Sequence, residues 1–161
     1  MIRIGHGYDL HRLTEDQAKK GLKLGGIQIP YSKKFVAHSD GDVLVHALID
    51  ALLGAAGLGD IGQHFPDTDP KYKGCDSLEL LDIVMTLLKE QGYRIHNGDI
   101  TVIAQKPKLA PYISFMREIL CTRLEISLKD INIKAKTNEQ CDAVGKEEAI
   151  AVFAVVTLVP K

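Results

Sequence analysis

Apolar residues recur at helical spacing in three stretches of the chain and at strand-like spacing in five others. The helical stretches cover residues 42–57, 77–92 and 111–124, and a capping residue or a proline stands at the start of each. The extended stretches cover residues 2–13, 22–30, 93–104, 131–137 and 149–159. The last is apolar on both faces, which predicts a central strand or one at a subunit contact.

Strands and helices are mixed along the chain, with hairpins as well as crossover connections. This order predicts an α+β fold with a mixed four- to five-stranded sheet and helices packed on one face. The Gly25–Gly26 pair predicts a bulge in the second strand, and residues 58–70 predict a loop rich in Gly, Pro and Asp. No linker or repeat divides the 161 residues, so we expect one domain over residues 1–161.

Composition narrows the range of partners. The 20 Lys and Arg residues balance 21 Asp and Glu residues, which argues against nucleic acid or an anionic membrane as a partner but allows a small anionic substrate. The three cysteines show no CxxC spacing, and no apolar run approaches the roughly 20 residues of a membrane span. We therefore expect a cytoplasmic protein, or an organellar one of the stroma or lumen after removal of a transit peptide.

Three polar residues form a line along the first predicted helix. Asp42, His46 and Asp50 stand at helical spacing among apolar neighbours, where polar groups are costly to bury without partners. Asp9 and His11 point to the same side of an extended strand. Two imidazoles and a carboxylate suit one divalent metal, and three protein ligands leave the open position that is typical of catalytic zinc.

Spacing alone also allows simpler interpretations. His11 would then be a solvated residue at a strand end, and His46 a hydrogen-bonded core histidine. If His46 does bind a metal, Asp42 or Asp50 is the expected acceptor for its second ring nitrogen. A catalytic metal needs an empty position, so three further histidines are expected in loop or substrate-contact roles: His6, His38 and His64.

Four lysines occur in two segments, residues 104–109 and 134–139, each at the end of a predicted strand. With Thr137 and Asn138, these lysines form a candidate site for a phosphorylated ligand. Glu139 is a candidate for Mg²⁺, which is commonly bound by a carboxylate together with substrate phosphates. Two solvated loops would have the same composition. The chain contains no Walker A or GxGxxG pattern.

Three segments together resemble one enzyme family along the full chain. The segments are GHGYDLH at residues 5–11, AHSDGDVLVH at residues 37–46 and GDIGQHFPDTD at residues 59–69. They are similar to the 2-C-methyl-D-erythritol 2,4-cyclodiphosphate synthases of non-mevalonate isoprenoid biosynthesis. The resemblance implies a homotrimer whose active sites lie at subunit interfaces. Each site would join a zinc- and diol-binding half from one subunit to a cytidine pocket from its neighbour.

The resemblance also implies roles for individual residues. One zinc per subunit would be held by Asp9, His11 and His46, and Mg²⁺ or Mn²⁺ with the substrate diphosphate by Glu139. The methylerythritol and its phosphate would contact His38, Ser39, Asp60, Ile61, Gly62, Phe65 and Asp67. The cytidine pocket would comprise Ala104, Lys108, Leu109, Ala135, Lys136 and Thr137. The axial cavity of the trimer would include Tyr8 and Lys146.

The implied enzyme is a phosphorus–oxygen lyase acting on 4-diphosphocytidyl-2-C-methyl-D-erythritol 2-phosphate. The 2-phosphate attacks the β-phosphorus, CMP leaves and a cyclic diphosphate forms. Lys136, Ala143 and Lys146 replace a threonine, an aromatic residue and an arginine of the family. Lysine lacks the bidentate phosphate contact of arginine, which argues against isoprenoid diphosphate binding in the axial cavity. Two other classes are a non-catalytic nucleotide- or prenyl-phosphate-binding trimer and a zinc hydrolase; the intact motifs favour the synthase.

Overall fold

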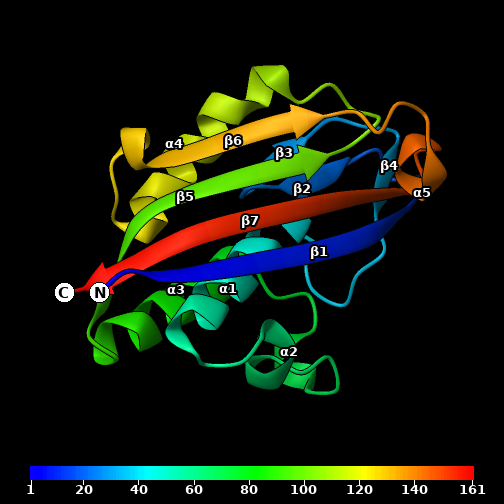
Figure 1. The fold of residues 1–161 in the computed structure, drawn as a ribbon. Helices are drawn as coiled ribbons and strands as arrows, with labels where there is room; N and C mark the ends of the chain where they lie inside the picture. The colour runs from blue at the N-terminus through cyan, green and yellow to red at the C-terminus, as the bar shows by residue number, and fades with distance from the viewer.

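Five strands form one mixed sheet in the computed structural model, which describes all residues 1–161 (Figure 1). β5 and β6 are parallel and the other neighbouring strands are antiparallel. β7 lies at the centre, as its apolar pattern predicts, so the α+β class and the mixed sheet are confirmed. Across the sheet the order is β4 (Lys33–Phe35), β1 (Arg3–Glu15), β7 (Ala149–Pro160), β5 (Tyr93–Ile103) and β6 (Ile131–Lys136).

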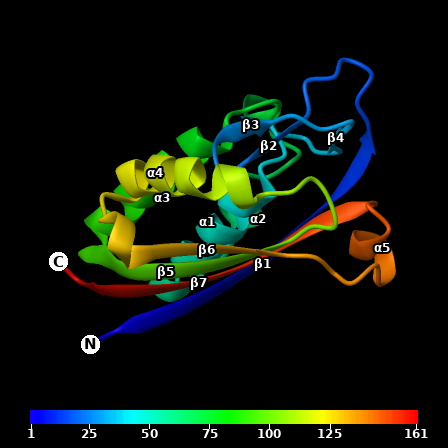
Figure 2. The ribbon, with the colours of Figure 1, turned by 90° about the horizontal axis from the view of Figure 1, so that it is seen from above.

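Three main helices lie on one face of this sheet (Figure 2). They are α1 (Val43–Ala56), α3 (Ser77–Glu90) and α4 (Ile113–Leu124), which confirms the three predicted helices and their common face. None is both long enough and apolar enough to cross a membrane. The shorter helical turns are α2 (Ile61–His64), α5 (Asp142–Gly145), η1 (Pro70–Tyr72), η2 (Ala110–Tyr112) and η3 (Leu128–Asp130).

The prediction of a single second strand was wrong. Residues 22–30 form a separate two-stranded hairpin of β2 (Leu22–Leu24) and β3 (Ile27–Ile29). Gly25 and Gly26 have φ of 60° and 80°, so the glycine pair makes the turn of this hairpin rather than a bulge. β4, which pairs with the end of β1, and α2, inside the predicted loop, were missed because each is only three or four residues long.

Helix α1 packs directly against β1 because two glycines leave room for it. A Cβ atom on Gly5 would lie 1.8 Å from the carbonyl oxygen of Ala51, and one on Gly7 would lie 1.9 Å from that of Ala47. The next residues on the same face of β1 are Asp9 and His11. They therefore lie beside the first turns of α1.

The opposite face of β1 and β7 carries no helix (Figure 2). Side chains from the two strands alternate onto this face and remain exposed although several are large and apolar. Tyr8 and Phe153 stack there with ring centroids 4.9 Å apart. Its exposed apolar side chains are Ile4 (71% exposed), Tyr8, Leu10, Phe153 and Val155.

Candidate active site

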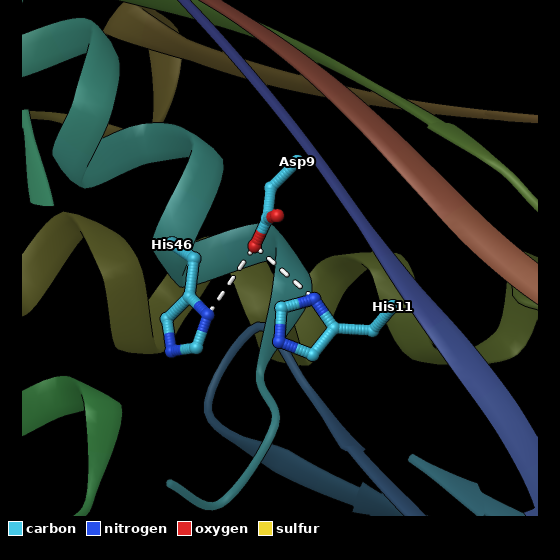
Figure 3. Close-up of side chains that lie close together, drawn as sticks. All are labelled: Asp9, His11 and His46. Carbon is cyan, nitrogen blue, oxygen red and sulfur yellow. Dashed lines mark ion pairs between the residues drawn. The ribbon is translucent and has the colours of Figure 1, made fainter. Parts of the chain in front are cut away.

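Three metal-ligand candidates converge where β1 passes the start of α1 (Figure 3). Asp9 Oδ2 lies 3.2 Å from His11 Nδ1 and 3.3 Å from His46 Nδ1. One ligand atom from each residue lies within 4.8 Å of the other two. The predicted convergence of Asp9, His11 and His46 is confirmed.

The chemistry of this group fits a divalent metal. Burial by itself would raise the pKa of Asp9, but the contacts with His11 and His46 outweigh it and hold the pKa well below its usual range. Asp9 is therefore an ionised carboxylate at neutral pH, the form that can bind a metal. Apart from its 3.2 Å ion-pair contact with Asp9, the buried His11 Nδ1 has no hydrogen-bond partner. A metal ion would satisfy this nitrogen, and the mixed N and O set is one that zinc accepts.

The second ring nitrogen of His46 contacts two serine hydroxyls. Nε2 lies 2.8 Å from Ser77 Oγ at the start of α3 and 3.3 Å from Ser39 Oγ in the loop before α1. Ser77 is fully buried, and its hydroxyl donates to Asp40. Sequence reasoning missed Ser77 because it lies 31 residues from His46 and nothing in its local pattern distinguishes it from an ordinary first-turn serine.

The expectation that Asp42 or Asp50 contacts the ring of His46 was wrong. Asp42 is the N-cap of α1, and its carboxylate accepts the N–H groups of Gly25, Gly26 and Val45 at 2.9, 2.7 and 3.1 Å. It therefore joins the β2–β3 hairpin to the helix. Asp50 accepts the N–H of Ile61 at 2.8 Å and so ties α2 to α1. Both carboxylates therefore hold main-chain segments in place around the metal-ligand group.

A cavity of about 570 Å³ opens beside the metal-ligand group. Of the residues expected around the methylerythritol and its phosphate, Asp60 alone lies outside the lining, because it is the exposed N-cap of α2 and accepts the N–H of Gln63 at 2.9 Å. His38 Nε2 is buried there without a hydrogen-bond partner. The cavity brings together Asp9, His11, His46, His38, Ser39, Ile61, Gly62, Phe65 and Asp67.

Two other histidines lie outside the cavity lining. His64 Nε2 lies 2.8 Å from the carbonyl oxygen of Leu58, a contact within the loop that carries α2. His6 is exposed on the helix-free face of the sheet, with its ring centroid 6.1 Å from that of Phe153. Neither belongs to the metal-ligand group.

The residues of the expected cytidine pocket lie at the carboxyl ends of β5 and β6. The N–H of Ala104 donates to the carbonyl oxygen of Lys136 at 2.9 Å, and Thr137 Oγ1 lies 3.3 Å from Glu139 Oε1. None of these residues lines the cavity beside His46. Within one chain, β7 and β5 separate β1 from β6, so the two groups of residues are apart.

Two of the four lysines near those strand ends already have acidic partners. Lys134 pairs with Asp99, and Lys106 Nζ lies 3.5 Å from Glu147. Lys108 and Lys136 remain exposed, with no salt bridge to an acidic side chain. The positive charge free for a ligand is therefore smaller than the sequence alone indicates.

Fold and site together define an α+β protein with a three-residue metal-ligand group that opens onto a substrate-sized cavity. The family model described as YgbB family matches residues 2–159. The chain belongs to this family.

Named relatives and solved structures agree with this assignment. A 2-C-methyl-D-erythritol 2,4-cyclodiphosphate synthase from Thioalkalivibrio sulfidiphilus is 57% identical over 98% of this chain and 96% of its own length. A bifunctional IspDF from Campylobacter jejuni has a TM-score of 0.94 and 42% identity, covering 100% of this chain and 43% of that one. IspF from Plasmodium falciparum, in a CDP complex, has a TM-score of 0.86 and 38% identity, covering 99% of this chain and 97% of that one.

Proposed function

We propose that this protein converts 4-diphosphocytidyl-2-C-methyl-D-erythritol 2-phosphate into 2-C-methyl-D-erythritol 2,4-cyclodiphosphate and CMP. This is a step of non-mevalonate isoprenoid biosynthesis. The observation that carries the proposal is the group of Asp9, His11 and His46 at a cavity, in a chain that is 57% identical to a synthase of that name. Residues 1–161 form its single catalytic domain.

The metals of the reaction have distinct ligands. Asp9, His11 and His46 would hold one zinc per subunit, at the group of side chains that lines the cavity. Glu139 would hold Mg²⁺ or Mn²⁺ together with the substrate diphosphate. When bound, these ions supply Lewis-acid stabilisation of negative charge on the diphosphate oxygens.

The chain itself binds and orients the substrate. The methylerythritol and its phosphate occupy the cavity, where His38 and Ser39 offer polar contacts, Ile61 and Phe65 offer apolar ones, and Gly62 offers main chain. Asp60 and Asp67 flank this segment. Because both reacting groups are anionic, holding them in line is the main task of the protein.

The cytidine of the substrate binds at the ends of β5 and β6. The nucleobase would contact main chain next to small or apolar side chains. The exposed Lys108 and Lys136 would face the phosphates of the substrate. The complex of the Plasmodium falciparum relative with CDP supports this class of ligand. The residues of this pocket are Ala104, Lys108, Leu109, Ala135, Lys136 and Thr137.

The reaction is an intramolecular phosphoryl transfer. An oxygen of the 2-phosphate forms a bond to the β-phosphorus, and the bond from that phosphorus to the oxygen bridging the α-phosphorus breaks. CMP leaves with the bridging oxygen, so no water is consumed and the enzyme is a phosphorus–oxygen lyase. A phosphate nucleophile is already ionised at neutral pH, so no strong general base is required.

Three copies of the chain assemble through the helix-free face of the sheet. Contiguous exposed apolar side chains on β1 and β7 support this assembly, because monomeric proteins rarely leave such a surface open. In the trimer, the cytidine pocket of one subunit completes the metal-binding half of its neighbour. Tyr8 and exposed Lys146 line the axial cavity, and the single ammonium group of Lys146 disfavours isoprenoid diphosphate binding there.

Incubation with the cytidyl substrate, Zn²⁺ and Mg²⁺ tests the proposal. We expect equimolar CMP and cyclodiphosphate from the unmodified protein, and loss of both products and of bound zinc in His46→Ala. His96→Ala, an exposed histidine on β5, is the matched control and should behave as the unmodified protein. Wild-type turnover by a zinc-free His46→Ala would contradict the proposal, as would CMP binding without any turnover.

A further inference from the structure

The surroundings of His46 determine which of its ring nitrogens can bind a metal. A neutral imidazole carries one proton, so the protonated nitrogen cannot coordinate. Nδ1 lies 3.3 Å from Asp9 Oδ2 on the side of the metal-ligand group, whereas Nε2 lies 2.8 Å from Ser77 Oγ. Coordination through Nδ1 therefore places the proton on Nε2 and requires an acceptor at Ser77.

The hydroxyl of Ser77 is oriented so that it can accept a hydrogen bond from His46. Its single proton goes to Asp40 Oδ1, and an ionised carboxylate can only accept. The N–H of Ser77 also donates to Asp40 Oδ2 at 3.0 Å, so both donors of Ser77 are committed to Asp40. Only the lone pairs of Ser77 Oγ are left to interact with His46, and they can accept a hydrogen bond from its Nε2.

Asp40 is itself held from two further directions. Lys23 Nζ on β2 lies 3.0 Å from Asp40 Oδ2, and the N–H of Asp42 donates to Asp40 Oδ1 at 3.1 Å. Ser77 is fully buried, so no water competes for its hydroxyl. The arrangement of Asp40 and Ser77 is thus fixed by three elements: the β2–β3 hairpin, the loop before α1 and the start of α3.

We propose that Asp40 and Ser77 are positioning residues that hold His46 as the Nε2–H tautomer and so present Nδ1 to the metal. This rests on the proposed function only in taking Asp9, His11 and His46 as a metal site. Ser39 Oγ lies at a longer 3.3 Å from the same nitrogen and accepts the N–H of Gly41 at 3.2 Å. It is the weaker acceptor of the two.

Zinc affinity gives the first test, measured by competition with a chromophoric chelator. Ser77→Ala should bind zinc about 10- to 100-fold more weakly, the usual effect of losing a hydrogen-bond partner of a metal-bound histidine. Asp76, the N-cap of α3, stays in place in this variant, so the helix keeps its cap. Equal affinity of Ser77→Ala and the unmodified protein would overturn the proposal.

Asp76→Asn is the matched control for charge. Asp76 Oδ1 lies 2.8 Å from the same Lys23 Nζ but has no contact with the hydroxyl of Ser77, and asparagine also caps helices. This variant should bind zinc as the unmodified protein does. A loss equal to that of Ser77→Ala would indicate a general charge effect and overturn the proposal.

The tautomer itself gives a second test, and its deciding result comes from the unmodified protein. In the zinc-loaded, ¹⁵N-labelled protein, NMR of the imidazole nitrogens should show a proton on His46 Nε2 that exchanges slowly with water. Ser77→Ala should lose that protection. A proton on Nδ1 in the unmodified protein would overturn the proposal. Failure of the unmodified protein to bind zinc would instead overturn the metal site of the proposed function, and this proposal with it.

Discussion

Asp50 illustrates how a single carboxylate can organise a binding surface without facing the ligand. It lies one helical turn after His46 on α1, and its Oδ1 accepts the N–H of Ile61 at 2.8 Å. Ile61 and Gly62 line the cavity, and Asp60 caps the same short helix. A four-residue helix has little stability of its own, so this bond holds the segment in the conformation that the substrate meets.

Asp50→Ala should therefore weaken substrate binding more than it slows the chemical step. A lost hydrogen bond to a charged group is worth about 1.5 kcal/mol or more, which corresponds to a rise in KM of roughly tenfold. Asp50→Asn keeps a side-chain oxygen in place and should stay close to the unmodified protein. KM for the cytidyl substrate and hydrogen exchange at Ile61 are the measurements. An unchanged KM with unchanged exchange in Asp50→Ala would contradict this role.

Which residues of the site can be predicted from sequence depends on how local their contacts are. Asp9 and His11 share a strand face, and His46 breaks an apolar helix, so each carries a local signal. The partners of His46 carry none: Ser77 is brought in by the packing of α3 on α1, and the pairing of Lys134 with Asp99 depends on the register of β5 and β6. These contacts are visible only once the chain is folded.

Between elements, the close approach of α1 to β1 sets the geometry of the metal-ligand group. Gly5 and Gly7 allow helix backbone to lie against strand backbone, and this places His46 beside Asp9 and His11. Any side chain on these glycines would push the helix away. The glycines are therefore as much part of the site as its ligands.

Gly7→Ala should destabilise the fold by about 3 kcal/mol or more, because its Cβ would lie 1.9 Å from the carbonyl oxygen of Ala47. Gly54→Ala is the control, since its Cβ would come no nearer than 4.0 Å to the main chain of β1. Replacing a helical glycine there should stabilise by up to about 1 kcal/mol. Urea denaturation of both variants measures the difference, and equal stabilities would show that the close approach is not required.

Asp40 connects three elements, and its contribution to stability should depend on pH. Burial alone would raise the pKa of Asp40, but its bonds with Ser77, the N–H of Asp42 and Lys23 outweigh it and lower the pKa below the ordinary 3.8. The folded protein then binds protons less readily than the unfolded chain. The stabilisation is complete above pH 3.8 and is lost as the pH falls through the lower folded-state pKa.

Asp40→Asn should therefore be less stable than the unmodified protein at neutral pH by about 1 kcal/mol or more. The difference should shrink as the pH falls below 3.8, where the carboxyl of the unmodified protein also becomes neutral. Urea denaturation at a series of pH values is the measurement. A difference that stays constant from neutral to acid pH would show that the charge of Asp40 does not stabilise the fold.

Element prediction succeeded where patterns were long and failed where they were short. The three main helices and the strands of the sheet, apart from β4, each span six residues or more, enough for periodicity to show. β2, β3 and β4 have three residues each, and their pairing depends on glycine turns and on the length of β1. The Gly25–Gly26 pair is visible in the sequence, but two adjacent glycines are as compatible with a bulge as with a turn.

For the whole molecule, the arrangement of the two candidate half-sites matters most. In one chain the metal-ligand cavity and the ends of β5 and β6 lie apart, although a cytidine diphosphate substrate would have to reach both. The proposed assembly through the exposed face of β1 and β7 would allow neighbouring chains to complete each other's sites. The sequence predicts that β7 is central or at a subunit contact because this strand is apolar on both faces, but the absence of a covering helix is evident only in the fold (Figure 2).

Ile4→Asp combined with Val155→Asp should convert the proposed trimer into monomers, because the carboxylates would be desolvated at the proposed subunit contact. Zinc binding should persist, since its ligands come from one chain, whereas turnover should be lost. Ile83→Asp with Phe115→Asp, on exposed positions of α3 and α4, is the matched control and should remain trimeric. Light scattering after gel filtration gives the mass. A monomeric variant with full turnover would contradict the interface site.

In the proposed reaction the phosphoryl group is transferred within the substrate and not to water. Turnover in H₂¹⁸O with Zn²⁺ and Mg²⁺, followed by mass spectrometry of both products, tests this directly. We predict CMP and a cyclic diphosphate that both lack ¹⁸O, because the attacking oxygen comes from the 2-phosphate. A linear product carrying one ¹⁸O atom would show hydrolysis and contradict intramolecular transfer.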